Sequence, residues 1–172
     1  YDRHDIKILQ TDDEGNVDFV VYGYMNRGRH EGYNGLVSYS FSPKTDVTTE
    51  IFFVTFESPY EFIKEELDVL CAKGGNGMFY FRQNNTAYAV DLKSLEMMEV
   101  MNGPLYSNGT QSRFAWVDDN GNITVMNIGT GTTGSVSASN GDALSILTFY
   151  GDDMVIGRGR PTETWYIGKR VR

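Results

Sequence analysis

The sequence predicts an all-β fold with one short helix, and three observations support this prediction. The chain is rich in turn and strand residues, with 19 Gly and 13% aromatic residues within a 40% hydrophobic composition, a balance that favours strands joined by tight turns. Short β-prone runs alternate with turn residues along almost its whole length. Finally, residues 113–128 place Asp119-Asn120-Gly121-Asn122 between two apolar runs, which is the pattern of a β-hairpin.

The expected strands follow one another at short intervals. The run 19–25 is almost continuously apolar, as expected for a strand buried on both faces. The run 36–41 alternates with period two, which is typical of a strand with one wet face. The expected strands cover 6–9, 19–25, 36–41, 48–56, 78–82, 86–92, 97–101, 105–106, 113–117, 123–128, 143–150, 154–157 and 164–167, with a weak strand near Val136.

A helix interrupts the strands after residue 56. Ser58 fits an N-cap, Pro59 the first helical position, and Glu61 completes a capping box. Its end is open to two interpretations. Helical spacing would carry it to Lys73, whereas the alternation of apolar residues up to Cys71 suits a strand. The repeat described next favours a helix of about two turns followed by a strand.

A four-strand unit recurs along the chain. The second strands of the units align at Val20, Phe79, Phe114 and Met154, and each is followed by a third strand, a turn and, where the chain extends that far, a fourth strand. A period of about 35 to 60 residues with four strands is typical of propeller blades. We place the units at approximately 1–56, 57–101, 102–137 and 138–172, within a single domain.

On these residues the chain resembles a bacterial β-propeller of the WD40/TolB-like kind, although it has no WD dipeptide. The resemblance is architectural and covers nearly the whole chain. It implies a partial β-propeller of four-stranded antiparallel blades, roughly three and a half of them. Because the sequence begins at Tyr1 and propellers usually have at least four blades, we expect a segment of a larger propeller protein; the alternatives are a matured chain or an open array of sheets. The resemblance also implies a binding or scaffolding role and, with the Tyr-, Asn- and Gly-rich composition, an extracytoplasmic or cell-surface location.

Charge and cysteine content exclude several functions. The net charge of −8 and a pI near 4.7 argue against nucleic-acid binding, which needs a basic surface. No apolar run approaches the roughly 20 residues of a membrane span, so no membrane insertion is expected within this segment. The single cysteine, Cys71, cannot form an internal disulfide, and no Cys/His cluster can hold zinc. We interpret it as a buried, inert thiol, and we predict no cofactor.

The densest basic cluster in this acidic chain is the candidate ligand site. A radial arrangement of blades would bring it to the same side as a second cluster in the last unit, where Arg guanidinium groups could bind an anion through two parallel hydrogen bonds. The alternative is solvated loop charge that pairs with nearby acids. The candidate residues are Arg27, Arg29 and His30 in the first unit, and Arg158 and Arg160 in the last.

Two acidic turns are weaker candidates for a calcium site. Residues 12–14 with Asp18, and residues 118–122, offer several oxygen ligands, but their spacing does not match an EF-hand. We therefore favour a turn-forming role and predict no metal site. Among the aromatic residues, Trp116 is expected in the core, whereas Trp165, near the end, could be exposed and stack on a sugar or peptide.

These observations favour a non-enzymatic propeller segment that binds a protein, peptide or glycan. The alternative is a fragment of a propeller enzyme, such as a glycosidase, a lyase or the gating domain of a peptidase. A third option is a structural spacer. Open sheet ends are prone to pair with another chain, which predicts either an edge-mediated homodimer or protection of the edge by the helix near Pro59.

Overall fold

The computed structural model describes residues 3–56, 62–151 and 154–168. Within these ranges the chain forms four antiparallel sheets and one helix. Each sheet takes its strands in chain order, so the chain runs up and down through one sheet before it enters the next. The predicted all-β fold of four-stranded antiparallel units with one short helix is confirmed.

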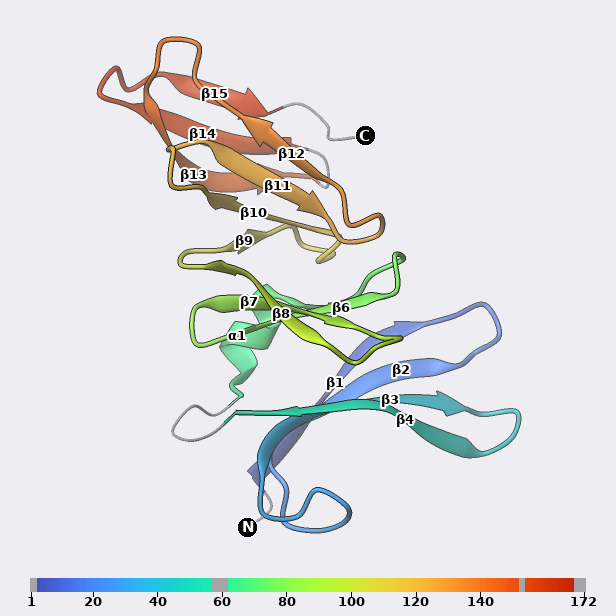
Figure 1. Ribbon diagram of the computed structural model, residues 1–172. Coiled ribbons are helices and arrows are strands. Elements are labelled where there is room, and N and C mark those ends of the chain that lie inside the picture. The colour runs from blue at the N-terminus through green and yellow to red at the C-terminus, as the bar shows by residue number, and fades with distance from the viewer. Residues whose placement is uncertain (1–2, 57–61, 152–153, 169–172) are drawn as a thin grey trace.

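The sheets follow the order of the sequence, and Figure 1 shows them stacked one on another, with the first and fourth sheets at opposite ends. The first sheet contains β1 (Arg3–Thr11), β2 (Val17–Tyr24), β3 (Asn34–Ser42) and β4 (Val47–Thr55). The second contains β5 (Cys71–Lys73), β6 (Met78–Gln83), β7 (Thr86–Asp91) and β8 (Met97–Asn102). The third contains β9 (Tyr106–Ser107), β10 (Arg113–Val117), β11 (Ile123–Asn127) and β12 (Thr133–Val136). The fourth contains β13 (Ala143–Tyr150), β14 (Met154–Arg160) and β15 (Trp165–Gly168).

The turns follow the local chemistry of their residues. The predicted hairpin is formed by β10 and β11, which pair with Ala115 opposite Val125. Its turn places Gly121 at φ 76°, a conformation that costs glycine little. The turn between β6 and β7 uses Asn84 and Asn85, both at positive φ, because asparagine tolerates this region better than most residues.

The helix is short and a strand follows it, as the repeat predicted. It covers Lys64–Val69, and β5 begins at Cys71. Its N-cap position is occupied by Ile63, whose side chain makes no capping hydrogen bond. This helix therefore begins later than the capping signal at Ser58, Pro59 and Glu61 predicted, and those three residues lie outside the described residues.

Three apolar cores fill the spaces between successive sheets. The first joins Val20, Leu36 and Phe52 of the first sheet to Phe79 and Phe81 of the second. The second joins the second and third sheets, and the third joins the third and fourth. The members that define these two cores are Tyr80, Ala89, Phe114 and Ile128 in the second, and Ala115, Val125, Leu144 and Ile146 in the third.

The two middle sheets are buried on both faces, which explains their continuous apolar runs. Successive side chains of a strand point to opposite faces. In β6, Phe79 and Phe81 therefore pack towards the first sheet while Tyr80 packs towards the third. In β10, Phe114 packs towards the second sheet and Ala115 towards the fourth. Both sides of these strands must be apolar, as in other sheets covered on both faces.

The first sheet is different, because only one of its faces meets another sheet. Val20 and Tyr22 of β2 are buried against the second sheet, whereas Phe19 and Val21 point the other way and are half-buried. The prediction that this strand is buried on both faces is therefore wrong for the described chain. Its apolar run belongs to a sheet whose outer face lacks a covering sheet. No helix among the described residues is long and apolar enough to cross a membrane.

The core between the first two sheets should dominate stability. Phe81 is fully buried and its ring lies near those of Phe62, Phe79 and Tyr88. We expect Phe81→Ala to reduce the free energy of unfolding by about 3–5 kcal/mol, measured by urea denaturation. Tyr24→Ala, at a side chain that is 42% exposed, is the control and should change it by less than about 0.5 kcal/mol. Equal effects of the two substitutions would contradict this assignment of the core.

Candidate functional site

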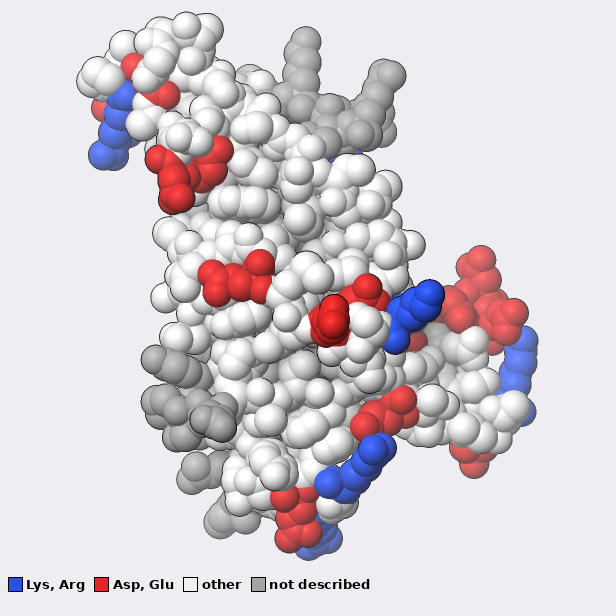
Figure 2. Space-filling view, viewed as in Figure 1, with Lys and Arg blue, Asp and Glu red and all other residues white. Residues whose placement is uncertain are grey.

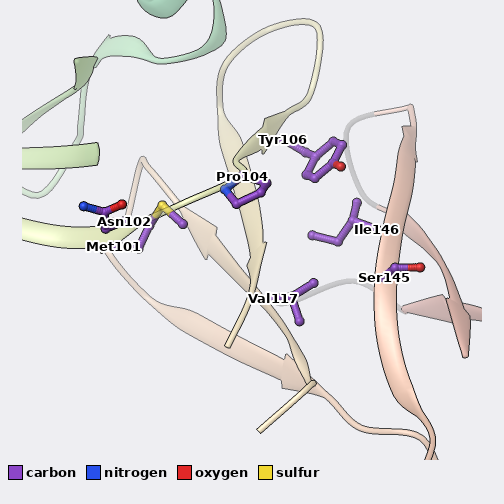
Figure 3. Close-up of a pocket in the computed structure, with 7 residues that line it drawn as sticks. All are labelled: Met101, Asn102, Pro104, Tyr106, Val117, Ser145 and Ile146. Carbon is purple, nitrogen blue, oxygen red and sulfur yellow. The ribbon is translucent and has the colours of Figure 1, made fainter. Parts of the chain in front are cut away.

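A small cavity lies where the second, third and fourth sheets meet. Its volume is about 200 Å³. It is enclosed by the chain that leaves β8, by the two-residue strand β9, by the end of β10 and by β13. The lining residues are Met101, Asn102, Pro104, Tyr106, Val117, Ser145 and Ile146 (Figure 3).

The cavity exists because β9 is too short to cover its neighbour. β9 pairs with β10 only through Ser107 opposite Phe114 and Tyr106 opposite Ala115. Val117, two residues further along β10, has no partner on β9 in the described chain, and its side chain stays 38% exposed. β13 closes the other side, and its register shifts directly after Ile146.

The walls of the cavity are mainly apolar. Figure 3 shows the side chains of Pro104, Tyr106, Val117 and Ile146 pointing towards one another across it. The Ser145 hydroxyl points away and donates a hydrogen bond to the carbonyl oxygen of Arg158 at 3.2 Å. Small-molecule sites usually measure about 300–1,000 Å³ and carry polar groups that orient the ligand. This cavity is smaller, so it suits one bulky apolar group.

A strand edge lies next to the cavity. β9 and β13 are the first strands of the third and fourth sheets and contact each other. β13 pairs with β14 on one side only, and in the described chain its other edge carries no strand. An extended peptide can add to such an edge by main-chain hydrogen bonds while its side chains fill pockets.

The predicted anion-binding residues form two separate groups. Arg27, Arg29 and His30 lie in the loop between β2 and β3, while Arg158 and Arg160 lie at the end of β14. Figure 1 shows that the turns after β2 and β14 leave their sheets on the same side of the stack, but the two sheets are its opposite ends. The structure does not bring the two groups together.

Three of these five residues already contact acidic or aromatic side chains. The His30 ring stacks on Phe53 with centroids 3.8 Å apart, and its Nε2 atom lies 3.0 Å from Oε2 of Glu50. Arg29 lies 3.5 Å from the same carboxylate, and Arg158 forms an ion pair with Glu163. The loop residues therefore help to cover the first sheet.

Arg27 and Arg160 are exposed, and a ligand role for the five residues stays a prediction. On the face shown in Figure 2, acidic and basic side chains are interspersed, with large uncharged areas between them.

The acidic turns are built alike and use their first carboxylate internally. Oδ1 of Asp118 accepts hydrogen bonds from the backbone N–H groups of Asn120 and Asn122, at 2.9 and 3.0 Å. Oδ1 of Asp12 accepts equivalent bonds from Glu14 and Asn16, at 2.9 and 2.8 Å. These geometries support the turn-forming interpretation. Among the described residues, no group of three or more His, Cys, Asp or Glu side chains could hold a metal ion.

The lone thiol fits the interpretation of an inert core residue. Cys71 is 2% exposed and belongs to the core between the first two sheets. Burial raises its pKa to about 12. Because the thiolate is the nucleophilic form, Cys71 stays protonated and unreactive at neutral pH.

The cavity residues were not predicted as a site. The sequence marks residues 102–104 as a break and 105–106 as a short strand, which is the local cause of the cavity. The sequence gives no sign that Ile146, about forty residues after this short strand, lines the same cavity.

Comparison with known proteins gives little further information. The sequence matches no known protein family and no curated protein. Among solved structures, the tricorn protease is similar with a TM-score of 0.21 and 10% identity, over 96% of this chain and 25% of that chain. The chain thus spans a quarter of the length of that protein.

The Asp118 turn yields a pH-dependent prediction. Hydrogen bonds from the Asn122 backbone N–H, the Asn120 N–H and the Asn122 side chain hold the pKa of Asp118 below its usual 3.8. The stabilisation from this lowered pKa is therefore complete above pH 3.8 and is lost as the pH falls through the folded-state pKa.

We expect Asp118→Ala to lower the free energy of unfolding at pH 7 by about 1 kcal/mol, as for other side chains that cap backbone N–H groups, with a smaller difference from wild type at pH 3. Urea denaturation at both pH values measures this. The control is Asp119→Ala in the same turn, which should have little effect. A difference that is unchanged or larger at pH 3 would be inconsistent with the proposed role of the carboxylate.

Proposed function

We propose that this chain is a non-enzymatic binding module that holds a segment of a protein or peptide at the junction of the third and fourth sheets. The bound segment lies along the edge of β13 that does not pair with β14. It inserts one apolar side chain into the cavity between Tyr106, Val117 and Ile146. The observation that carries the proposal is this cavity, which is apolar, of side-chain size, and adjacent to a strand edge.

The chemistry of the cavity favours a peptide over a glycan. Sugars need polar groups that converge on their hydroxyls together with an aromatic platform. Here the Ser145 hydroxyl is turned away from the cavity, and so is the Asn102 side chain in Figure 3. The Tyr106 ring and the aliphatic side chains of Val117 and Ile146 instead match an aliphatic or aromatic side chain.

The surrounding structure holds this site in a fixed shape. Ile146 is also a member of the core between the third and fourth sheets, and Met101 belongs to the core between the second and third. Walls that are part of packed cores lose little conformational entropy when a ligand binds. The site is thus preformed.

The test is selection of peptides from a random library on the whole chain, followed by fluorescence anisotropy of the selected peptides. We expect Val117→Glu to weaken binding at least about tenfold, because the ligand's apolar group would have to desolvate a charge. The matched control is Val47→Glu, at a valine of β4 that is 51% exposed and belongs to the first sheet, which should leave affinity unchanged.

Two outcomes would overturn the proposal. One is a library that yields no binder while a glycan array does. The other is a selected peptide that binds wild type and Val117→Glu equally well, which would place its site elsewhere on the chain.

A further inference from the structure

We infer that the outer faces of the first and fourth sheets bind each other between two copies of this chain, head to tail. The first-sheet face is made of side chains that point away from the second sheet: Ile6, Ile8, Phe19, Val21 and Tyr39. The fourth-sheet face is made of side chains that point away from the third sheet: Tyr150, Trp165 and Ile167.

The first-sheet face is apolar and open along β1 and β2. Ile6 and Ile8 lie opposite Val21 and Phe19, so all four side chains share the face opposite to that of buried Val20. Ile6 is 64% and Ile8 68% exposed. Phe19 stacks on Tyr39 with ring centroids 5.4 Å apart, which extends the apolar surface onto β3.

The remaining part of the same face is already covered by the chain itself. His30 stacks on Phe53 of β4. Val37 of β3 lies opposite Phe53 and therefore on the same outer face, yet it is only 1% exposed. The loop between β2 and β3 thus covers the β3–β4 side and leaves the β1–β2 side free.

The fourth-sheet face also carries large exposed apolar side chains. Trp165 and Ile167 of β15 alternate with Tyr166, which packs into the core between the third and fourth sheets, so they point outwards. They are 67% and 62% exposed, and Tyr150 of β13 is 66% exposed. Two charged residues share this face: Arg158, which lies opposite Trp165 and is paired with Glu163, and exposed Arg160 at the end of β14.

The three interfaces inside the chain show which face fits which. Each sheet presents one face to the sheet before it and the other to the sheet after it. Towards the preceding sheet, β6 presents Phe79 and Phe81, and β10 presents Phe114 and Trp116. In β2, Phe19 and Val21 lie on the corresponding face.

The first-sheet face is therefore of the kind that packs on a preceding sheet, and the fourth-sheet face is of the kind that packs on a following one. Each is the complement of the other by the pattern that the chain itself repeats three times.

The two faces cannot meet within one chain, because they lie at opposite ends of the stack (Figure 1). Two chains can satisfy both faces at once. Four sheets from each copy would form one ring, within the range of about four to eight blades that propellers use. Head-to-tail contacts that close in this way give a finite assembly and not a fibre.

Charge sets the salt dependence of this association. The formal net charge is −8 per chain, so two copies repel each other at low ionic strength. The apolar side chains that form the two faces are uncharged, and the charged groups on the fourth-sheet face are the Arg158–Glu163 pair and Arg160. Salt should therefore strengthen the dimer by screening the repulsion, whereas an interface held by ion pairs would weaken.

Sedimentation velocity of the whole chain, from about 1 to about 200 µM, tests the inference. We expect a monomer–dimer equilibrium that shifts towards dimer in added salt. Ile8→Glu and Trp165→Glu should each weaken dimerisation at least about tenfold, because each places a charge in both contacts of the ring. Leu95→Glu, at a leucine that is 56% exposed in the turn before β8, is the control and should have no effect.

Mixing the two face variants gives the sharpest result. A mixture of Ile8→Glu and Trp165→Glu retains one intact pair of faces, the first-sheet face of one variant with the fourth-sheet face of the other. The mixture should therefore form more dimer than either variant alone. Circular dichroism should show that each variant is folded as the wild type is.

A wild type that stays monomeric up to the highest concentration overturns the inference. So does a dimer that neither variant weakens, or a mixture that shows no rescue, since edge pairing or a symmetric contact of like faces would behave in that way. Peptide binding at the cavity is measured separately, so failure of one proposal leaves the other intact.

Discussion

The structure depends on face-to-face packing of small twisted sheets. A four-stranded sheet of short strands has little stability alone, so each sheet is stabilised by the side chains of its neighbours. Aromatic rings carry much of this contact between the first two sheets, as in the pair of Phe52 and Phe79, whose centroids lie 4.8 Å apart. Because every strand has two faces, this constraint propagates: covering one face of the second sheet leaves its other face in need of the third. The stack is the consequence.

The candidate site follows from a place where the packing between the third and fourth sheets is incomplete. β9 has two residues, whereas the first strand of the neighbouring fourth sheet has eight. The mismatch leaves Val117 and Ile146 facing a space that no strand fills. A binding site formed in this way needs no added loop or domain. Two of the residues around it, Met101 and Ile146, are members of the cores on either side.

The strands, the hairpin turn and the repeat could be predicted because their signals are local. Period-two or continuous apolar runs, and Asn-Gly turns such as Asn120-Gly121, are set by interactions within a few residues. The cavity could not be predicted, because Tyr106 and Ile146 meet only after the third and fourth sheets have packed. The environment of His30 is equally non-local: its contacts with Glu50 and Phe53 depend on how a polar loop folds back over its own sheet. Alternation in β3 predicted a wet face on the side of Ser38, yet Ser38 is buried, because it lies opposite Val20 on the face that meets the second sheet.

The apolar run of β2 is informative because the prediction drawn from it differs from the described structure. A strand that has only one covered face normally carries polar residues on the other, as β4 does with exposed Thr48, which lies opposite Phe41 on the outer face. β2 instead carries Phe19 and Val21, and β1 adds Ile6 and Ile8, at positions where solvent would favour polar side chains. The loop that holds His30 covers the other half of this face with a polar outer surface, so the chain does have a means of shielding it from water. That it shields only the β3–β4 side is understandable if the β1–β2 side is reserved for contact with another sheet.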